Sequence, residues 1–150
     1  AGEAGNAEDV KAAVHMGAVR IGHGVRIAGN KEVIQLVKDK GIFLEMCPTS
    51  NRQTKAVEEM SAYPLKTFLE MGLKVTLNTD DPAIERTTLS REFRYMESLL
   101  DLTQEQKRLL LLNSVEAAFT SGNRKCKLKE QLFSEPYENY DEPIIYKRIK

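Results

Sequence analysis

The sequence predicts an α/β fold in which short parallel strands alternate with helices. Three times a helical pattern ends at a glycine and a short apolar strand follows; these glycines are Gly17, Gly41 and Gly72. Each strand then runs into a polar segment. Such regular alternation is typical of parallel strands joined by crossover helices. Three strands are too few to close an eight-stranded barrel, which takes about 250 residues. The pattern alone therefore fits an open sheet or part of a barrel.

The first two helix–strand units have clear boundary signals. Residues 7–16 are amphipathic and have acidic residues in the first turn, where the helix dipole favours them. We expect a strand over residues 18–22 to follow. Asn30 can cap a second helix over residues 31–40, whose apolar residues share one face. The second strand is predicted over residues 42–46.

The rest of the chain is richer in helix. A helix over residues 63–71 has Pro64 near its first turn, a position that suits proline. The third strand is predicted over residues 73–77. Further helices are predicted over residues 89–100, 104–120 and, with a more polar pattern, 123–133. We interpret residues 134–150 as a surface tail, so that the predicted domain covers residues 1–133.

The composition excludes several classes of protein. The 150 residues carry 22 Lys and Arg against 22 Asp and Glu, and this zero net charge argues against a nucleic-acid-binding platform. An apolar fraction of 41% is enough for a buried core. No apolar run approaches the roughly 18–20 residues of a membrane span. The two cysteines lie far apart, which favours a reducing compartment and therefore a cytoplasmic location.

The polar segments after the strands are the candidate functional region, because parallel sheets bind ligands beyond the carboxyl ends of their strands. His23 stands between two glycines after the first strand. Its imidazole could be a general base, a metal ligand or an oxyanion partner. An equally acceptable interpretation is a hydrogen-bonded histidine at the rim of the sheet. His15 lies on a helix and is expected to face solvent.

Two adjacent carboxylates, Asp80 and Asp81, follow the third strand. Their side chains should point to different sides of the chain, so that one could hold a metal and the other a substrate. The alternative is helix capping, with Asp81 as N-cap and Pro82 in the first turn. Glu3, taken alone, is typical of a frayed terminus.

Cysteine chemistry receives little support. Cys47 could be a nucleophile, but no histidine is placed in sequence to activate it, and a cysteine after an apolar run is usually a small core residue. Cys126 lies on a polar helix with no chemical partner. The paired H-x-E and P-C-x-x-C motifs of one class of zinc deaminase are absent, as are the glycine-rich phosphate-binding motifs.

Four segments, taken in order, resemble the C-terminal half of the adenosine deaminase family, whose fold is an amidohydrolase-type (β/α)8 barrel. The resemblance covers about residues 1–120 and is carried by Ala1-Gly2-Glu3-Ala4-Gly5, Gly22-His23-Gly24, Cys47-Pro48-Thr49-Ser50-Asn51 and Asn78-Thr79-Asp80-Asp81-Pro82. It implies that the fold is a partial (β/α)8 barrel containing about strands 6–8 and their helices. Because the chain starts with Ala1, we expect a processed product or a piece of a longer protein.

The resemblance implies a zinc-activated water that attacks C6 of adenosine or deoxyadenosine and releases ammonia, as in purine salvage. Glu3 resembles the proton shuttle to the purine N1, and His23 the residue that orients the zinc-bound hydroxide. Asp80 resembles the carboxylate zinc ligand, and Asp81 the partner of the purine N7. Cys47 stays a structural residue.

The resemblance also shows what the chain lacks. The family has further zinc ligands in a His-x-His motif on the first strand and in a histidine that would precede Ala1. We therefore expect activity to require the remaining N-terminal half of the barrel. Adenine or AMP could replace adenosine as substrate, although AMP calls for a basic cluster and only Arg86 and Arg91 are near. A catalytically inactive binding protein or growth-factor-like protein is a further alternative, and an unrelated barrel hydrolase is the weakest.

Overall fold

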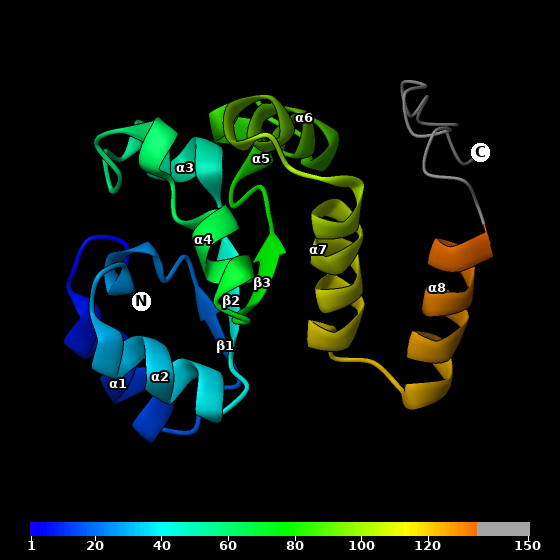
Figure 1. Ribbon diagram of the computed structural model, residues 1–150, viewed down its shortest axis with the longest axis horizontal. Helices are drawn as coiled ribbons and strands as arrows, with labels where there is room; N and C mark the ends of the chain where they lie inside the picture. Colours follow the sequence, from blue (N-terminus) through cyan, green and yellow to red (C-terminus); the bar gives the residue numbers. More distant parts are fainter. Residues whose placement is uncertain (135–150) are drawn as a thin grey trace.

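A computed structural model of the protein describes residues 1–134 and contains one parallel sheet at its centre (Figure 1). The strands are β1 (Arg20–Gly22), β2 (Phe43–Met46) and β3 (Lys74–Leu77), and they lie in the order β1-β2-β3. The register pairs Ile21 with Leu44, and Leu44 with Val75. All but the first residue of the predicted tail, 134–150, lies outside the described residues.

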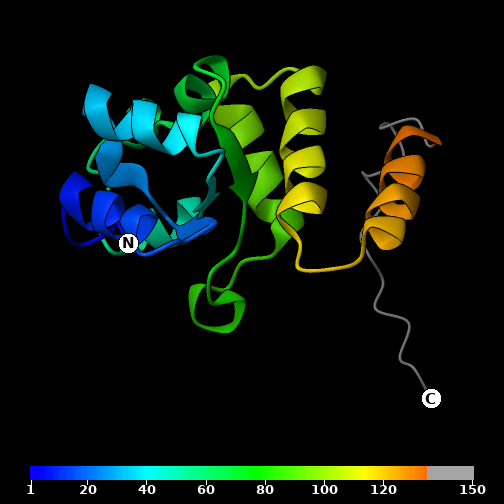
Figure 2. The ribbon, with the colours of Figure 1, turned by 90° about the horizontal axis from the view of Figure 1, so that it is seen from below.

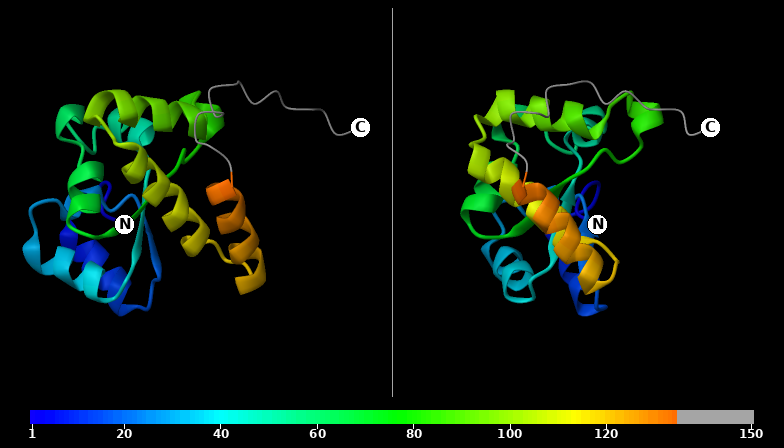
Figure 3. Two further views of the ribbon diagram at one scale, coloured as in Figure 1. Left: turned by 45° about the vertical axis from the view of Figure 1, so that its right-hand side comes forward. Right: turned by 90° about the vertical axis from the view of Figure 1, so that its right-hand side faces the viewer.

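One set of helices alternates with the strands, and a second set lies at the carboxyl end of the sheet. Those that alternate with the strands are α1 (Ala7–His15), α2 (Lys31–Asp39) and α4 (Leu65–Glu70). At the carboxyl end of the strands lie α3 (Pro48–Gln53), α5 (Pro82–Glu85) and α6 (Leu89–Leu100) (Figures 1 and 3). The 3₁₀ turns are η1 (Val25–Ile27) and η2 (Met60–Ala62). No helix within residues 1–134 has the length and apolar character needed to cross a membrane.

Two long helices extend the molecule beyond β3. Helix α7 (Gln104–Ala117) packs against β3, and Asn113 donates a hydrogen bond from its side chain to the Val75 carbonyl oxygen at 2.9 Å. Helix α8 (Gly122–Ser134) contacts α7 on the side away from the sheet (Figures 1 and 2). The sheet is therefore covered at β3, while α8 lies in an outer layer.

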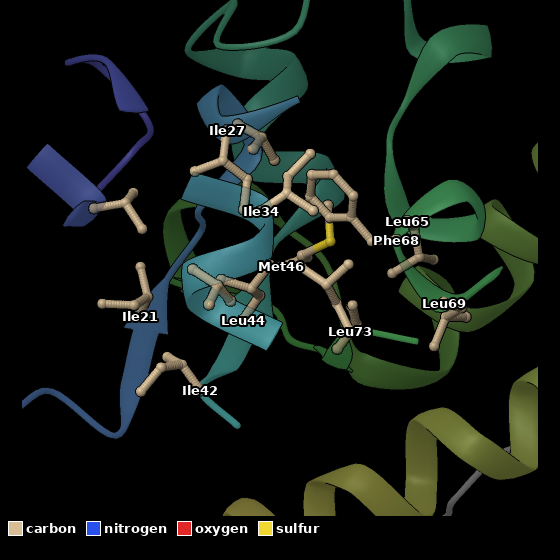
Figure 4. Packing of buried hydrophobic residues seen from close by; sticks show 14 of the residues in the cluster. Ile21, Ile27, Ile34, Ile42, Leu44, Met46, Leu65, Phe68, Leu69 and Leu73 are labelled. Carbon is tan, nitrogen blue, oxygen red and sulfur yellow. The ribbon is translucent and has the colours of Figure 1, made fainter. Parts of the chain in front are cut away.

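The hydrophobic core joins the strands to the alternating helices (Figure 4). Leu44, Met46 and Val75 in the strands and Leu65 and Phe68 in α4 are almost completely buried. Each such side chain contributes roughly 1.5–3 kcal/mol relative to exposure. This packing holds the strands rigidly, and it therefore fixes the positions of the segments that leave their carboxyl ends.

The predicted order of helices and strands is confirmed, with small shifts at the ends. Each strand begins one or two residues later than expected, and the helix over residues 89–100 is found as predicted. The predicted helix over residues 63–71 begins only at Leu65, because Pro64 is its N-cap and Tyr63 is the C-cap of η2. The polar segment after β2, for which no helix was predicted, forms α3 with Pro48 in its first turn.

Candidate active site

The segments that leave the three strands are held together by backbone hydrogen bonds that continue the pairing of the sheet. The His23 amide donates to the Glu45 carbonyl oxygen at 2.8 Å, and the Asn78 amide donates to the Met46 carbonyl oxygen at 2.9 Å. The hydrogen-bonding pattern of the sheet thereby extends one residue beyond β1 and one residue beyond β3. Side chains that follow the strands are consequently placed on a rigid edge.

His23 and Asp80 both have left-handed backbones, with φ of 65° and 64°. This conformation is uncommon outside glycine, although histidine and aspartate adopt it more readily than most residues. It costs on the order of 1–3 kcal/mol, and residues strained in this way cluster at functional sites. The sequence gives no local sign of it.

The first residues of the chain lie beside the loop after β1. The Gly24 amide donates to the Ala1 carbonyl oxygen, and the Arg26 amide to the Gly2 carbonyl oxygen, each at 3.0 Å. The Arg26 Nε also donates to the Glu3 carbonyl oxygen at 3.0 Å. Glu3 is therefore anchored rather than frayed, contrary to what its position alone suggested.

These contacts bring Glu3, His23 and Asp80 together. His23 Nε2 lies 3.3 Å from Glu3 Oε2 and 3.8 Å from Asp80 Oδ2. The His23 side chain is mostly buried, whereas the Asp80 side chain is nearly half exposed. One imidazole nitrogen thus faces two carboxylates that lie far apart in the sequence, one at the start of the chain and one after β3.

Helix α3 and its C-cap residue supply polar partners for both carboxylates. Ser50 Oγ donates to Asp80 Oδ2 at 2.8 Å, and Thr54 Oγ1 donates to Glu3 Oε1 at 3.0 Å. Residues four apart share a helix face, which explains why these two hydroxyls reach the same site. Thr54 was not singled out from the sequence. Proline in the first helical turn after an apolar strand is the signal that could have predicted α3.

Asp81 points away from this group. Its Oδ1 accepts hydrogen bonds from the amides of Ala83 and Ile84, each at 3.1 Å, and Pro82 occupies the first turn of α5. Of the two interpretations offered by the sequence, helix capping is therefore observed. The adjacent carboxylates do diverge, as expected from strand geometry.

A cavity of about 470 Å³ opens at the strand ends, and its lining includes His23, Glu45, Cys47, Asn78 and Asp80. This volume lies within the range of sites for small molecules, roughly 300–1,000 Å³. Glu3 and Asp81 lie outside the lining. A small-molecule ligand here would meet His23, Glu45 and Asp80 directly.

Cys47 is buried, and this burial, helped by the Asp80 carboxylate, raises the pKa of its thiol to about 12. The thiol is therefore protonated at neutral pH and is no nucleophile. Burial and the nearby Asp80 carboxylate also raise the pKa of Glu85, although the neighbouring Ser50 hydroxyl opposes them. Asp80 and Glu85 place two carboxylates close together at the strand ends, which favours a cation there.

The remaining chemical candidates lie elsewhere. His15 is exposed on α1, as expected, and Cys126 is exposed on α8. Among residues 1–134, no three or more His, Cys, Asp or Glu side chains are grouped so that they could hold a metal ion. A catalytic zinc site generally has three protein ligands. Asp80 has the right chemistry for one ligand, but the described residues do not make a complete zinc site.

Comparison with known sequences identifies the relatives of the chain. The family described as "Adenosine deaminase" matches residues 1–135. The chain is 46% identical over 130 residues to an adenosine deaminase of Clostridium botulinum, a match that covers 86% of this chain and 39% of the relative. It is 44% identical over 128 residues to an adenosine deaminase of Haemophilus ducreyi, covering 85% and 37%.

Solved structures show the same relationship. An adenine deaminase of Arthrobacter aurescens superposes with a TM-score of 0.84 at 31% identity, covering 88% of this chain and 41% of that one. An Arabidopsis N6-mAMP deaminase gives a TM-score of 0.80 at 25% identity, covering 89% and 40%. The chain spans about two fifths of the length of the deaminases that it matches. The family match across residues 1–135, together with these relatives, shows that the chain belongs to the adenosine deaminase family.

Proposed function

We propose that this chain forms part of a metal-dependent deaminase that hydrolyses adenosine or deoxyadenosine, releasing ammonia. The observation that carries this proposal is the convergence of two carboxylates on one imidazole nitrogen, with Glu3 at 3.3 Å and Asp80 at 3.8 Å. A carboxylate and an imidazole at neighbouring positions can move protons and stabilise developing charge during attack by water. The relatives support the same reaction class.

Each residue has a distinct proposed role. Glu3 delivers a proton to the purine N1, and His23 orients the attacking oxygen and stabilises its charge. Asp80 is one ligand of a zinc ion, and the other ligands come from outside the described residues. Zinc, when bound, supplies a water whose pKa is lowered to about 7. Asp81 is the proposed partner of the purine N7.

We infer that β1, β2 and β3 correspond to about strands 6–8 of a (β/α)8 barrel. Residues 1–133 then belong to that barrel, and residues 134–150 follow it as a tail. Support comes from the parallel order of the strands and from the superposition on deaminase structures. The outer edges of β1 and β3 would pair with further strands, because a barrel has no free edge. A cytoplasmic location follows from the sparse, unpaired cysteines.

Among the purine substrates, we favour a compound without a phosphate group. AMP would require a basic group beside the purine, and Arg86 and Arg91 line a separate cavity of about 190 Å³. The larger cavity at the strand ends has no Lys or Arg in its lining. Adenine stays the second candidate, because the Arthrobacter relative is an adenine deaminase.

Replacing Glu3 by Gln in the full-length protein tests the proposal. Ammonia release from adenosine, adenine and AMP is measured together with the zinc content. We expect the wild-type protein to prefer adenosine and Glu3→Gln to lose about 10²–10⁴-fold in kcat, the usual contribution of general acid–base catalysis. Zinc should be retained, because Glu3 is not a proposed ligand.

The matched control is Glu8→Gln, which makes the same change at an exposed position on α1. This variant should deaminate like the wild type. If Glu3→Gln deaminates adenosine at the wild-type rate, the proton-shuttle role is wrong. A wild-type protein that binds zinc but releases ammonia from none of the three purines would instead support the inactive-protein alternative.

A further inference from the structure

Behind His23 lies a buried pair of polar side chains that the proposed reaction does not use. Asn51 on α3 is completely buried, and Tyr63, which follows η2, is 2% exposed. The Tyr63 hydroxyl donates to Asn51 Oδ1 at 2.8 Å. On its other side, Asn51 Nδ2 lies 2.9 Å from His23 Nδ1 and 3.3 Å from Glu3 Oε1. The Asn51–Tyr63 pair thus connects the hydrophobic core to His23 and Glu3.

The contacts of Asn51 determine which way its amide points. Burial raises the pKa of Tyr63 well above its ordinary value, so the hydroxyl keeps a proton to donate. The Asn51 oxygen can only accept, and it therefore faces Tyr63. A reversed amide would place that oxygen against Glu3 Oε1, where two acceptors would meet. Both ends of the amide therefore favour the same orientation.

This orientation determines which nitrogen of a neutral His23 ring carries the proton. The Asn51 Nδ2 nitrogen can only donate, so His23 Nδ1 must accept and cannot carry a hydrogen. The proton is then on Nε2, which faces the carboxylates of Glu3 and Asp80. These carboxylates are acceptors, so the donor and acceptor roles agree along the whole chain of contacts.

We propose that Asn51 and Tyr63 are positioning residues that hold His23 with Nε2 as a hydrogen-bond donor toward the strand-end cavity. The inference rests on the proposed function and narrows the role of His23 within it. A protonated Nε2 can neither accept a proton from water nor bind a metal ion. Of the three roles that the sequence left open, only donation to the reacting oxygen is compatible with this ring.

The test compares two substitutions in the full-length protein. Tyr63→Phe removes only the hydroxyl and leaves Asn51 free to turn. Asn51→Asp keeps the size of the side chain but places an acceptor opposite His23 Nδ1, which should move the ring proton to that nitrogen. Tyr95→Phe, at a half-buried tyrosine on α6 outside this network, is the matched control.

Two readouts separate positioning from mere stability. The first is the ¹⁵N NMR signal of the His23 ring, assigned by its loss in His23→Gln; the second is the split between kcat and KM. We expect a bare Nδ1 and a protonated Nε2 in the wild type, and a protonated Nδ1 in Asn51→Asp. Tyr63→Phe should lose about 10–100-fold in kcat, the usual range for groups that orient a site. Its KM should change less than twofold, because Tyr63 touches no substrate.

A protonated Nδ1 in the wild type overturns the inference, as does a kcat of Tyr63→Phe equal to that of Tyr95→Phe. If Asn51→Asp does not fold, Tyr63→Phe and the wild-type spectrum still decide the matter. The NMR readout needs no turnover. A wild-type protein without deaminase activity would therefore refute the proposed function and leave the ring assignment to be judged on its own.

Discussion

The two ends of the sheet use the same unusual backbone conformation for different purposes. At the amino end, the turns into β2 and β3 contain Gly41 and Gly72, with φ of 62° and 78°. At the carboxyl end, His23 and Asp80 have φ of 65° and 64°. Glycine adopts this geometry freely, whereas other L-residues are penalised. The carboxyl end therefore tolerates strain at positions where the side chain matters.

The contacts around the strained residues explain how the carboxyl end tolerates this conformation. The His23 amide bonds to the Glu45 carbonyl, and the Asp80 carboxylate accepts a hydrogen bond from Ser50. In α/β barrels the carboxyl end holds the chemistry and the amino end contributes mainly to stability. If this division applies here, substitutions at the two ends should separate activity from stability.

The largest expected effect is that of Asp80→Asn in the full-length protein. Asparagine accepts the left-handed backbone and can still bond to Ser50, so folding should change little. Loss of the charge should reduce zinc content and lower kcat/KM by more than about a hundredfold, because orienting groups alone contribute 10–100-fold. Metal analysis and ammonia release measure both.

The control for this prediction is Asp101→Asn. Asp101 is exposed and has φ of 50°, so it receives the same chemical change in the same backbone geometry away from the site. Zinc content and turnover should be unchanged. Equal losses in the two variants would mean that the charge at Asp80 has no special role.

The carboxyl end also contains an acidic residue that serves stability. The assignment of chemistry to one end and stability to the other is therefore not absolute. Glu92 on α6 is completely buried and accepts hydrogen bonds from the Thr87 hydroxyl at 2.5 Å and the Thr49 amide at 3.1 Å. Glu92→Ala leaves both donors unsatisfied and should lower the free energy of unfolding by at least about 2 kcal/mol. Urea unfolding measures this, with Glu105→Ala as an exposed control on α7. A loss of unfolding free energy no larger than that of the control would show that water replaces the carboxylate as the acceptor.

Gly72→Ala should cost about 1–2 kcal/mol of stability, the penalty of a left-handed backbone for an L-residue. An added Cβ would meet only the end of the Lys38 side chain at 3.5 Å, so no steric clash adds to the cost. Activity per folded molecule should stay at the wild-type level. A drop in kcat with stability unchanged would contradict the assignment of the amino end to stability.

The sequence predicted the features that depend on neighbouring residues. The helix–strand order followed from apolar periodicity, and the Asn30 and Asp81 caps from local side-chain chemistry. The contact between Asn51 and Tyr63 could not be predicted in this way, because it depends on how α3 packs against the core. Glu3 became a candidate only through the resemblance to a family, since its anchoring comes from a loop twenty residues away.

The smallest predicted effect concerns Cys47, a residue at the carboxyl end that serves packing. A pKa of about 12 means that the thiol stays protonated as the pH rises to 8, so the reactive thiolate is scarce. Within this chain, a thiol reagent at pH 8 should therefore label Cys126 in the native protein and Cys47 only after unfolding. Cys126→Ser identifies the site, because native labelling of this chain should then disappear. Labelling of Cys47 as fast as Cys126 would contradict both the packing role of Cys47 and the rigidity of the strand ends.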